Sequence, residues 1–286
     1  MHRRQNRYGS SALKYPEVFF MQFHESLAQQ KFIALQKKRQ QTVKIVRILL
    51  LIGVLMLWEL CARAGIINDF IFSSPVKIWR CLFSMILDGS MFLHTGITAL
   101  ETIISFLLVT LIGIFGAVLL WSSKTLAEIL DPYLVMLNSL PKSALAPILI
   151  VWLGSNMKTI IVAAVSVAVF GSILTLYNGF QHIDPDQIKL INALGGKKKD
   201  ILFKVLLPGS VPLIVSNMKV NIGLCLVGVI IGEFLTARAG LGYLIIYGSQ
   251  VFKLDLVMMA IVVLCVLSAG FYRGISRLSA YFLRQK

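Results

Sequence analysis

Six apolar stretches, each long enough to cross a lipid bilayer, constrain the fold of this chain more than any other feature of its sequence. An α-helix needs about 20 predominantly apolar residues for that crossing, and inside lipid its backbone polar groups must be bonded within the helix itself. The composition agrees, because 57% of the residues are hydrophobic and only 14% are charged, far from a typical soluble domain. We therefore predict an all-α, polytopic membrane protein with six transmembrane helices. The predicted spans are approximately Ile45–Ala64, Ile97–Trp121, Tyr133–Leu153, Thr159–Tyr177, Val211–Phe234 and Leu256–Ile275.

The segment before the first span, residues 1–44, is polar and basic, and we interpret it as an amino-terminal tail. No apolar core of a signal peptide lies near its start, so the first span is expected to remain as an anchor. Two apolar groups, Phe19–Phe23 and Phe32–Leu35, fit an interfacial helix as well as a partly disordered tail. After the first span, Ser73 and Ser74 predict a turn into a short helix that lies along the membrane.

The polar segment between the fourth and fifth spans, residues 184–208, predicts two short helices joined by glycines. Asp184 suits the capping position of a helix and the proline after it suits the first helical position. The glycine pair at 195–196 supplies the backbone freedom that ends this helix. A second helix, Lys197–Leu207, is expected to stop at Pro208, which lacks an amide donor. Such a hairpin is either a connection lying in the lipid interface or a docking element for a soluble partner.

The spacing of residues within this hairpin favours the docking role. Gly195 is followed by Val205, Leu207 and Pro208 at offsets of ten, twelve and thirteen residues. This spacing resembles the cytoplasmic loop signature of binding-protein-dependent ABC importer permeases, which reads Glu-Ala-Ala, three residues, Gly, nine residues, Ile, any residue and Leu-Pro. Other segments are similar to the nitrate, sulfonate and taurine branch of that family, and they match in order and spacing: Phe72–Pro75, Leu130–Pro132, Leu140–Pro147, Val151–Gly154 and Gly240–Ile245.

Five positions, at three places in the chain, depart from the family pattern. Lys189, Leu190 and Ile191 stand where the family has Glu-Ala-Ala, so the charge at the first position is reversed. Glu101 stands where relatives often carry a basic residue, and Arg273 where they often carry an aspartate. These departures indicate a divergent member whose partner surfaces have changed to match.

The resemblance implies a type I ABC importer permease, with residues 1–44 as a cytoplasmic tail and residues 45–286 as the transmembrane permease domain. The implied partners are ATPase subunits that hold ATP and Mg, an extracytoplasmic solute-binding protein, a second permease copy forming a homodimer, and membrane lipid. The implied solute is a small anion such as a sulfonate, nitrate or taurine, although similar permeases carry vitamins and their pyrimidine precursors. Gly195 is the expected hinge, and three apolar residues of the first hairpin helix form the expected knob. The coupling residues are Ile188, Lys189, Ile191, Leu194, Gly195, Val205, Leu207 and Pro208.

Several polar or helix-breaking residues lie inside the predicted spans, where each is costly unless it faces protein or a cavity. Pro141 and Pro147 are expected to interrupt the third span, as in broken helices beside transport pathways, or simply to kink it. Glu101 is either a charge that reaches the lipid headgroups or a pathway residue. Glu59 and Arg63, four residues apart, are expected to pair. The pathway candidates are Pro141, Pro147, Phe170, Asn217, Asn221 and Glu233.

The sequence also argues against several other functions. A phosphate-binding loop needs Gly-Lys followed by Ser or Thr, whereas Gly196 and Lys197 are followed by Lys198. No catalytic or metal-ligand constellation stands out, so we expect no enzyme activity in this chain and ATP hydrolysis on a separate subunit. The net charge of +15 lies in tails and loops without an aromatic platform, which argues against nucleic acid. The cysteines are expected to be buried free thiols: Cys61, Cys81, Cys225 and Cys265.

Orientation follows from the distribution of basic residues near the spans. The amino-terminal tail, the hairpin and the carboxyl-terminal end are the basic segments, and six spans place all three on one side. We therefore predict a cell-membrane protein with both termini and the hairpin in the cytoplasm. Two alternatives stay open. One is a non-transporting membrane scaffold or interaction protein that retains the permease fold, favoured by Lys189, and the other is a proton-driven transporter using Glu101 and Glu233.

Overall fold

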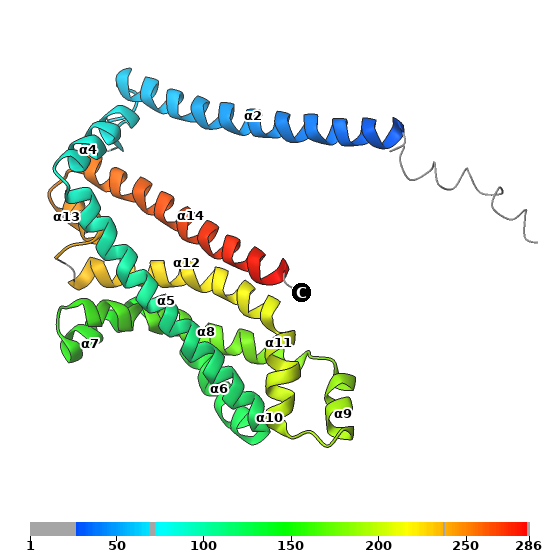
Figure 1. The fold of residues 1–286 in the computed structure, drawn as a ribbon. Coiled ribbons are helices and arrows are strands. Elements are labelled where there is room, and N and C mark those ends of the chain that lie inside the picture. Colours follow the sequence, from blue (N-terminus) through cyan, green and yellow to red (C-terminus); the bar gives the residue numbers. More distant parts are fainter. Residues whose placement is uncertain (1–26, 69–71, 237, 285–286) are drawn as a thin grey trace, which may run out of the picture. The chain divides into compact units, whose positions relative to one another are not determined.

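The computed structural model describes residues 27–68, 72–236 and 238–284, and all regular elements in these ranges are helices. The chain divides into two compact units, residues 1–64 and 65–286. The first unit contains α2 (Leu27–Arg63), and the second contains the remaining elements labelled in Figure 1. These are α4 (Pro75–Leu87), α5 (Ser90–Ser122), α6 (Lys124–Ser139), α7 (Lys142–Leu153), α8 (Met157–Gln181), α9 (Pro185–Ala193), α10 (Lys198–Ile201), the π-helical turn Leu202–Leu206, α11 (Leu207–Gly209), α12 (Val211–Thr236), α13 (Leu241–Gln250) and α14 (Leu254–Arg284).

The first unit is one long helix in its described part. Because α2 runs unbroken through Phe32 and Leu35, neither a separate interfacial helix nor a disordered tail describes residues 27–44. The other group considered for such a helix, Phe19–Phe23, lies outside the described residues. Near the far end of α2, Arg63 Nε donates to Glu59 Oε1 at 2.7 Å, which confirms the predicted ion pair.

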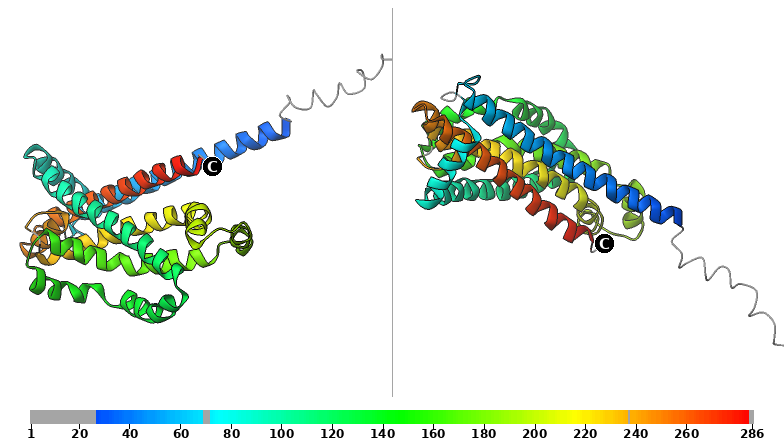
Figure 2. Two further views of the ribbon diagram at one scale, coloured as in Figure 1. Left: turned by 60° about the horizontal axis from the view of Figure 1, so that its bottom comes forward. Right: turned by 90° about the horizontal axis from the view of Figure 1, so that it is seen from above.

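The second unit is a bundle built around α8. This helix packs against α5 and α12, which also contact each other, while α6 and α7 lie along it and α13 packs on α14. Figures 1 and 2 show that α4 and α13 lie at one end of the bundle and that α9 and α10 lie at the opposite end. We call these the α13 end and the hairpin end. Helices α5 and α8 both run from the α13 end to the hairpin end, and α12 runs back from the hairpin end to the α13 end.

Within the described ranges, five helices are long and apolar enough to cross a membrane: α2 from Phe32 onward, α5, α8, α12, and α14 as far as Ala280. Helices α6 and α7 pass the same test together, as one span bent by 100°. The six-span prediction is therefore confirmed, with the bent pair as the third span. The other five predicted spans lie inside single helices to within one residue. Helix α4 begins at Pro75 with Ser74 as its cap, as predicted for the short helix after the first span.

Small residues let the central helices approach closely. A Cβ on Gly228 of α12 would lie 2.6 Å from the Cα of Ala164 on α8, and one on Gly113 of α5 would collide with Ser172. Close approach of this kind favours helix association in lipid, where packing replaces the hydrophobic effect. Ser172 also joins α8 to α12, because Asn217 and Asn221 of α12 both donate to its Oγ, at 2.7 and 2.9 Å. These amides are thus satisfied between two helices.

The break between α6 and α7 falls at Pro141, which is extended together with the residue before it. The proline has no amide to bond the carbonyl of Leu137. The ammonium of Lys142 replaces it, because Nζ donates to that carbonyl at 3.1 Å and also to the carbonyl of Asn138. Pro147 lies inside α7, so the second interruption predicted there is wrong. Its ring removes a single helical bond, and the helix continues around it.

Replacing Lys142 with methionine should destabilise the bent span, because two carbonyls at the end of α6 would lose their charged donor. A hydrogen bond to a charged group contributes about 1.5 to 3 kcal/mol, so the unfolding temperature of the purified protein in detergent should fall clearly. Arginine at the same position should restore most of the loss. The control is Lys124→Met on α6, whose side chain is 91% exposed. An equal fall in both methionine variants would contradict the role of Lys142.

Candidate functional site

The hairpin, residues 184–208, turns on its two glycines. Asp184 Oδ1 accepts the amide two residues further on at 2.9 Å, so α9 begins where its capping residue predicts. Gly195 has a φ of 76°, a left-handed conformation that other residues reach only with strain. Gly196 donates its amide to the carbonyl of Ile191 at 2.9 Å, and a Cβ there would lie 2.5 Å from Ile191 Cγ2. Gly195 is therefore needed for its left-handed conformation, and Gly196 because a side chain there would collide with Ile191.

The second arm of the hairpin differs from the predicted helix Lys197–Leu207. Asp200 Oδ2 accepts the amide of Lys197 at 2.9 Å and thereby caps α10. In the π-helical turn that follows, the amide of Leu207 bonds the carbonyl of Leu202, and Pro208 then lies inside α11. The predicted stop at Pro208 is therefore wrong. The widened turn changes the hydrogen-bond register ahead of the proline, so the helical path continues toward α12.

The apolar side chains of the hairpin are of two kinds, buried and exposed. Val205 and Leu206 are buried, and Leu206 packs against Ala117 of α5 and Leu176 of α8, so they attach the second arm to the bundle. By contrast, the side chains of Leu190, Leu194 and Phe203 are 59%, 76% and 66% exposed. We call these three the exposed hairpin side chains.

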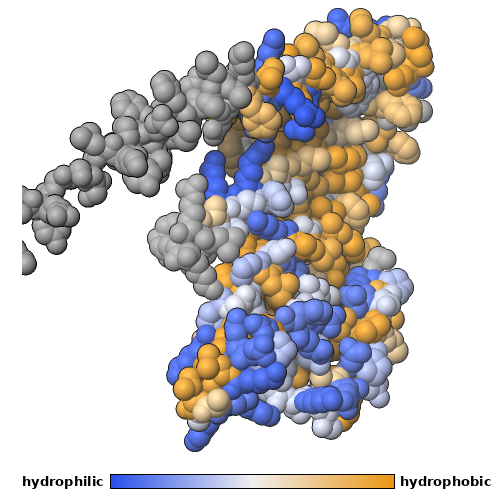
Figure 3. Space-filling view, turned by 90° about the vertical axis from the view of Figure 1, so that its right-hand side faces the viewer, coloured by the Kyte–Doolittle hydropathy of each residue, from blue (hydrophilic) through white to orange (hydrophobic). Residues whose placement is uncertain are grey.

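Of the predicted knob, Leu194 is fully on the surface, while Ile188 and Ile191 are half-buried. The sequence did not predict that Leu190 and Phe203 belong to the exposed apolar surface of the hairpin. The apolar spacing does not say which flank of a short helix faces the bundle, so only the packing identifies them. Figure 3 looks onto this part of the molecule, where hydrophilic residues gather with hydrophobic ones between them.

The charges of the hairpin are exposed and partly paired. Lys189, which stands where the family signature has glutamate, lies 2.9 Å from Asp186 on the same helix. Lys204 lies 3.1 Å from Asp200, and the Lys197 amide together with Lys204 lowers the pKa of the Asp200 carboxyl below its ordinary value. Exposed pairs such as these add little stability. They leave the hairpin a basic surface around its apolar side chains.

A buried polar cluster lies at the other end of the bundle, where α5, α12 and the start of α13 meet. Glu233 of α12 is completely buried and accepts the hydroxyl of Thr98 at 2.6 Å and the amide of Gly242 at 2.5 Å. Thr98 in turn accepts the amide of Leu241 at 2.8 Å. Nearby, the amide of Gly240 donates to His94 Nδ1 at 3.0 Å. The amides that begin α13 are thus held by side chains of two other helices.

Glu101 joins this cluster from α5. It is only 2% exposed, and Glu233 of α12 lies close to it. The interpretation of Glu101 as a charge reaching the headgroups is therefore wrong, since the side chain points into the bundle. Its second oxygen, Oε2, is buried without a hydrogen-bond partner. The pairing joins helices far apart in the sequence, and no local signal predicts it.

The other pathway candidates do not gather around one cavity. Asn217 and Asn221 are buried between α12 and α8, and Phe170 packs on a buried cluster that includes Leu120, Ala127 and Ile173, where α5, α6 and α8 meet. Pro141 and Pro147 are exposed at and after the break in the third span. The role of these residues in a pathway stays a prediction. The two asparagines also join α12 to α8 through Ser172.

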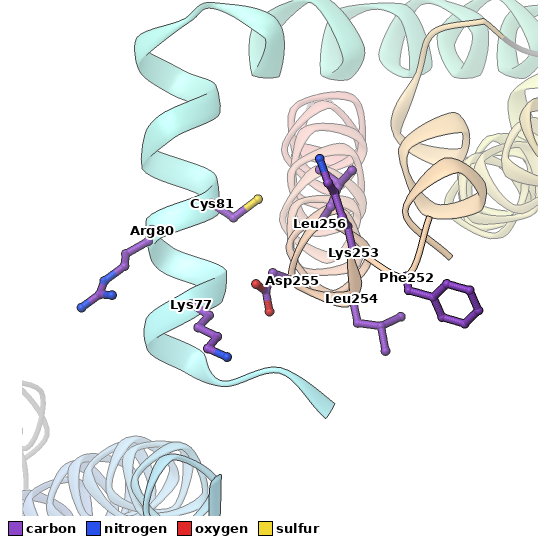
Figure 4. Close-up of a pocket in the computed structure, with 8 residues that line it drawn as sticks. All are labelled: Lys77, Arg80, Cys81, Phe252, Lys253, Leu254, Asp255 and Leu256. Carbon is purple, nitrogen blue, oxygen red and sulfur yellow. The ribbon is translucent and has the colours of Figure 1, made fainter. Parts of the chain in front are cut away.

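A basic pocket, about 510 Å³ in volume, lies at the α13 end between α4 and the connection from α13 to α14. Figure 4 shows Lys77 and Cys81 of α4 turned toward the segment that carries Lys253 and Asp255, while Arg80 of the same helix points away from it. Asp255 accepts the hydroxyl of Ser73 at 2.6 Å. Burial and then the nearby Asp255 raise the pKa of the Cys81 thiol, which keeps it protonated and unreactive. The pocket suits an anionic group.

The predicted thiols are confirmed as unpaired. Cys225 is buried in the bundle and Cys61 and Cys81 are half-buried, but Cys265 on α14 is exposed, so its expected burial is wrong. Among the described residues, no group of three or more metal-ligating side chains could hold a metal ion.

Six apolar spans among the described residues, one of them broken, and a polar helical hairpin between two of them define a polytopic membrane transport protein of the permease class. Residues 109–279 match the family described as binding-protein-dependent transport system inner membrane component. The chain belongs to this family.

Relatives of known description cover most of the chain. A probable ABC transporter permease protein of Haemophilus influenzae is 30% identical, over 84% of this chain and 98% of the relative. A putative aliphatic sulfonates transport permease protein of Bacillus subtilis is 26% identical, over 78% of this chain and 82% of the relative. A formylaminopyrimidine transport permease protein of Halalkalibacterium halodurans is 24% identical, over 66% of this chain and 75% of the relative. The predicted family and branch are confirmed.

Solved structures share the fold. A chain of the MetNI methionine ABC transporter in an inward facing conformation matches with a TM-score of 0.58 at 19% identity, over 67% of this chain and 96% of that one. The type I importer fold is thereby confirmed. The protein is a permease subunit of an ABC importer for a small solute.

Proposed function

We propose that this permease takes a small solute from an external solute-binding protein and passes it through the membrane, powered by separate ATPase subunits. The observation that carries this proposal is the hairpin. Its exposed apolar side chains, Leu190, Leu194 and Phe203, stand on a polar and basic element at one end of an apolar bundle. Exposed apolar residues with a polar rim are typical of a protein docking site.

In this proposal the hairpin transmits the motion of the ATPases. ATP and Mg bind on those subunits, and their closing pushes on α9 and the exposed hairpin side chains. Ile188 and Ile191, both half-buried, belong to the coupling surface of α9, and Gly195 forms the hinge. The push reaches α5 and α8 through the buried Val205 and Leu206, and it reaches α12 through Leu207 and Pro208, because α11 leads directly into α12. Lys189 contributes to the docking surface in place of the family glutamate.

The orientation follows from this arrangement. The hairpin end and both termini lie in the cytoplasm, and the α13 end faces the solute-binding protein. The basic pocket lined by Lys77, Arg80 and Lys253 would there meet an acidic group of that protein. Two copies of the permease form a homodimer in the lipid membrane, with the pathway at their contact. Candidate pathway residues on each copy are Pro141, Pro147, Phe170, Asn217, Asn221 and Glu233.

The solute is a small organic molecule or anion. The matched relatives are named for transport of aliphatic sulfonates and of formylaminopyrimidine, and both classes are candidates here. Because a delivered solute is chosen first by the binding protein, the partner decides between them.

The test is reconstitution of the complete complex. The permease is expressed with an ATPase subunit and a solute-binding protein of the same organism, purified, and placed in liposomes. We expect the ATPase to copurify, and we expect uptake of an alkanesulfonate or an aminopyrimidine that needs both ATP and the binding protein. A permease that copurifies with no ATPase and supports no uptake would instead favour the scaffold that retains this fold.

A further inference from the structure

Helix α2 carries a strongly basic segment directly before its membrane span. Figure 1 shows α2 as one uninterrupted helix, and its residues 27–44 precede the predicted span. Between Leu27 and Trp58 the sequence contains six lysines and arginines and no aspartate or glutamate. These basic side chains therefore have no acidic partner three or four residues away on their own helix. The proposed coupling through the hairpin gives this segment no role.

Half of this charge lies along one face of the helix. A groove about 410 Å³ in volume follows that face, and we call it the basic groove; it is lined by Gln36, Arg39, Gln40, Val43, Lys44 and Arg47. Side chains four residues apart lie one above the other on a helix, so these six residues form two neighbouring rows. The groove thus combines three cations with two amide groups, all of which can donate hydrogen bonds to an anion. Lys37 and Lys38 are exposed on the same helix but do not line the groove.

The position of the basic groove along α2 places it at the lipid headgroups. At a rise of 1.5 Å per residue, Lys44 lies about 1.5 Å and Arg39 about 9 Å before Ile45, where the apolar span begins. The headgroup layer outside the hydrocarbon core is about 5 to 7 Å thick. Arg47 lies two residues inside the span, close enough for its long side chain to extend back to that layer. All three cations of the groove therefore reach the phosphate groups of the membrane.

The same face of α2 continues as an exposed apolar surface. Leu50, Leu51 and Val54 follow Arg47 at offsets of three, four and seven residues, and their side chains are 66%, 61% and 55% exposed. A free anion gains nothing from this surface. A phospholipid, by contrast, places its phosphate in the groove and an acyl chain along these side chains, where apolar area is buried. In the proposed orientation the groove faces the cytoplasmic leaflet, which carries anionic lipids.

We propose that the basic groove of α2 binds the phosphate of an anionic phospholipid, with an acyl chain along Leu51 and Val54. A phosphate at the level of Lys44 lies between Arg39 and Arg47 along the helix, and each guanidinium offers paired donors to it. A zwitterionic headgroup carries its own cation beside the phosphate, so the groove selects lipids with a net negative charge. The inference goes beyond solute transport and takes only the orientation from the proposed function.

The test measures lipid binding by the full-length permease purified in a neutral detergent. Native mass spectrometry gives its affinity for dioctanoyl phosphatidylglycerol, for dioctanoyl phosphatidylcholine and for inorganic phosphate. Phosphatidylglycerol should bind roughly tenfold more tightly than either of the others. Arg39→Gln combined with Arg47→Gln should weaken its binding about 30-fold, since each basic residue beside an anionic headgroup contributes about fivefold. The affinity for phosphatidylcholine should not change.

The matched control is Lys37→Gln combined with Lys38→Gln, which removes the same charge outside the groove. All four substituted side chains are exposed, so neither double variant removes a packing contact. The control should weaken the binding of phosphatidylglycerol by less than about threefold, because its charges are screened by solvent. An equal loss in the two double variants would overturn the proposal, as would equal affinities for the two lipids. Inorganic phosphate that binds as tightly as phosphatidylglycerol would do the same, because the acyl chain would then contribute nothing.

An acidic surface of an ATPase subunit is the other partner that this charge could attract. If the Arg39 and Arg47 double variant kept its affinity for phosphatidylglycerol but no longer copurified with the ATPase, the groove would belong to that interface and the lipid site would be wrong. The binding measurement contains neither the ATPase nor the solute-binding protein. Failed uptake with intact, groove-dependent lipid binding would therefore overturn the proposed function and leave the lipid site in place.

Discussion

Aspartate in place of Leu194 or Phe203 should release the ATPase from this permease while leaving the permease folded in the membrane. Both side chains are largely exposed in the isolated chain, so neither substitution removes a contact of the bundle. At a docked interface each would bury an apolar group in a pocket of the partner. Such anchors contribute about 2 to 4 kcal/mol, which corresponds to a loss of affinity of about 30-fold to 1,000-fold. The measurement is the amount of ATPase that copurifies, followed by ATP-dependent uptake.

Two controls on the same hairpin sharpen this result. Asn192→Asp adds the same negative charge to the exposed surface of α9, and Phe203→Leu keeps an apolar side chain on the second arm. Both variants should retain the ATPase. If Asn192→Asp releases it as well, charge and not apolar contact controls docking. If Leu194→Asp and Phe203→Asp both retain the ATPase and transport, the hairpin is not the docking site.

The spans and the first half of the hairpin could be predicted because their causes are local. A run of apolar residues long enough for a bilayer predicts a crossing helix whatever it packs against. Asp184 and Gly195 act on the backbone within a few residues, so the beginning and the end of α9 follow from them directly. The bend at Pro141 follows in the same way, from a missing amide.

The second arm shows where local rules stop. Proline usually ends a helix because it lacks an amide, and the sequence around Pro208 offers no warning of an exception. The π-helical turn before it, Leu202–Leu206, adds a residue to the path and keeps the arm continuous. The buried Val205 and Leu206 hold that turn against the bundle. Packing against helices distant in sequence therefore decides whether the second arm ends at Pro208 or continues past it.

The buried carboxyl cluster could not be predicted for a related reason. Thr98 and Glu233 are 135 residues apart, and a single sequence does not say which faces of α5 and α12 meet. Hydropathy identifies an acidic residue in a span as costly, but it leaves open whether the residue meets lipid, water or another side chain. Glu101 and Glu233 were therefore recognised as unusual, whereas Thr98, their connection to α13, was not.

Leucine in place of Glu233 should be the most destabilising single change in the bundle. The substitution leaves the Thr98 hydroxyl and the Gly242 amide without their acceptor in a buried site. Removing one partner of a buried polar cluster costs about 3 to 5 kcal/mol. The free energy of unfolding in mixed micelles measures the loss, and Glu128→Leu on the exposed face of α6 should change it by less than about 0.5 kcal/mol.

A substitution at Gly242, the partner of Glu233 on α13, distinguishes a structural role of Glu233 from a role in the pathway. A Cβ at Gly242 would lie 2.7 Å from Glu233 Oε2, so Gly242→Ala should push α13 away and lower stability too. Because both changes act on one contact, the double variant should lose less than the sum of the two single losses. Full additivity, or uptake abolished in Glu233→Leu at unchanged stability, would show that Glu233 serves the solute and does not hold α13 in place.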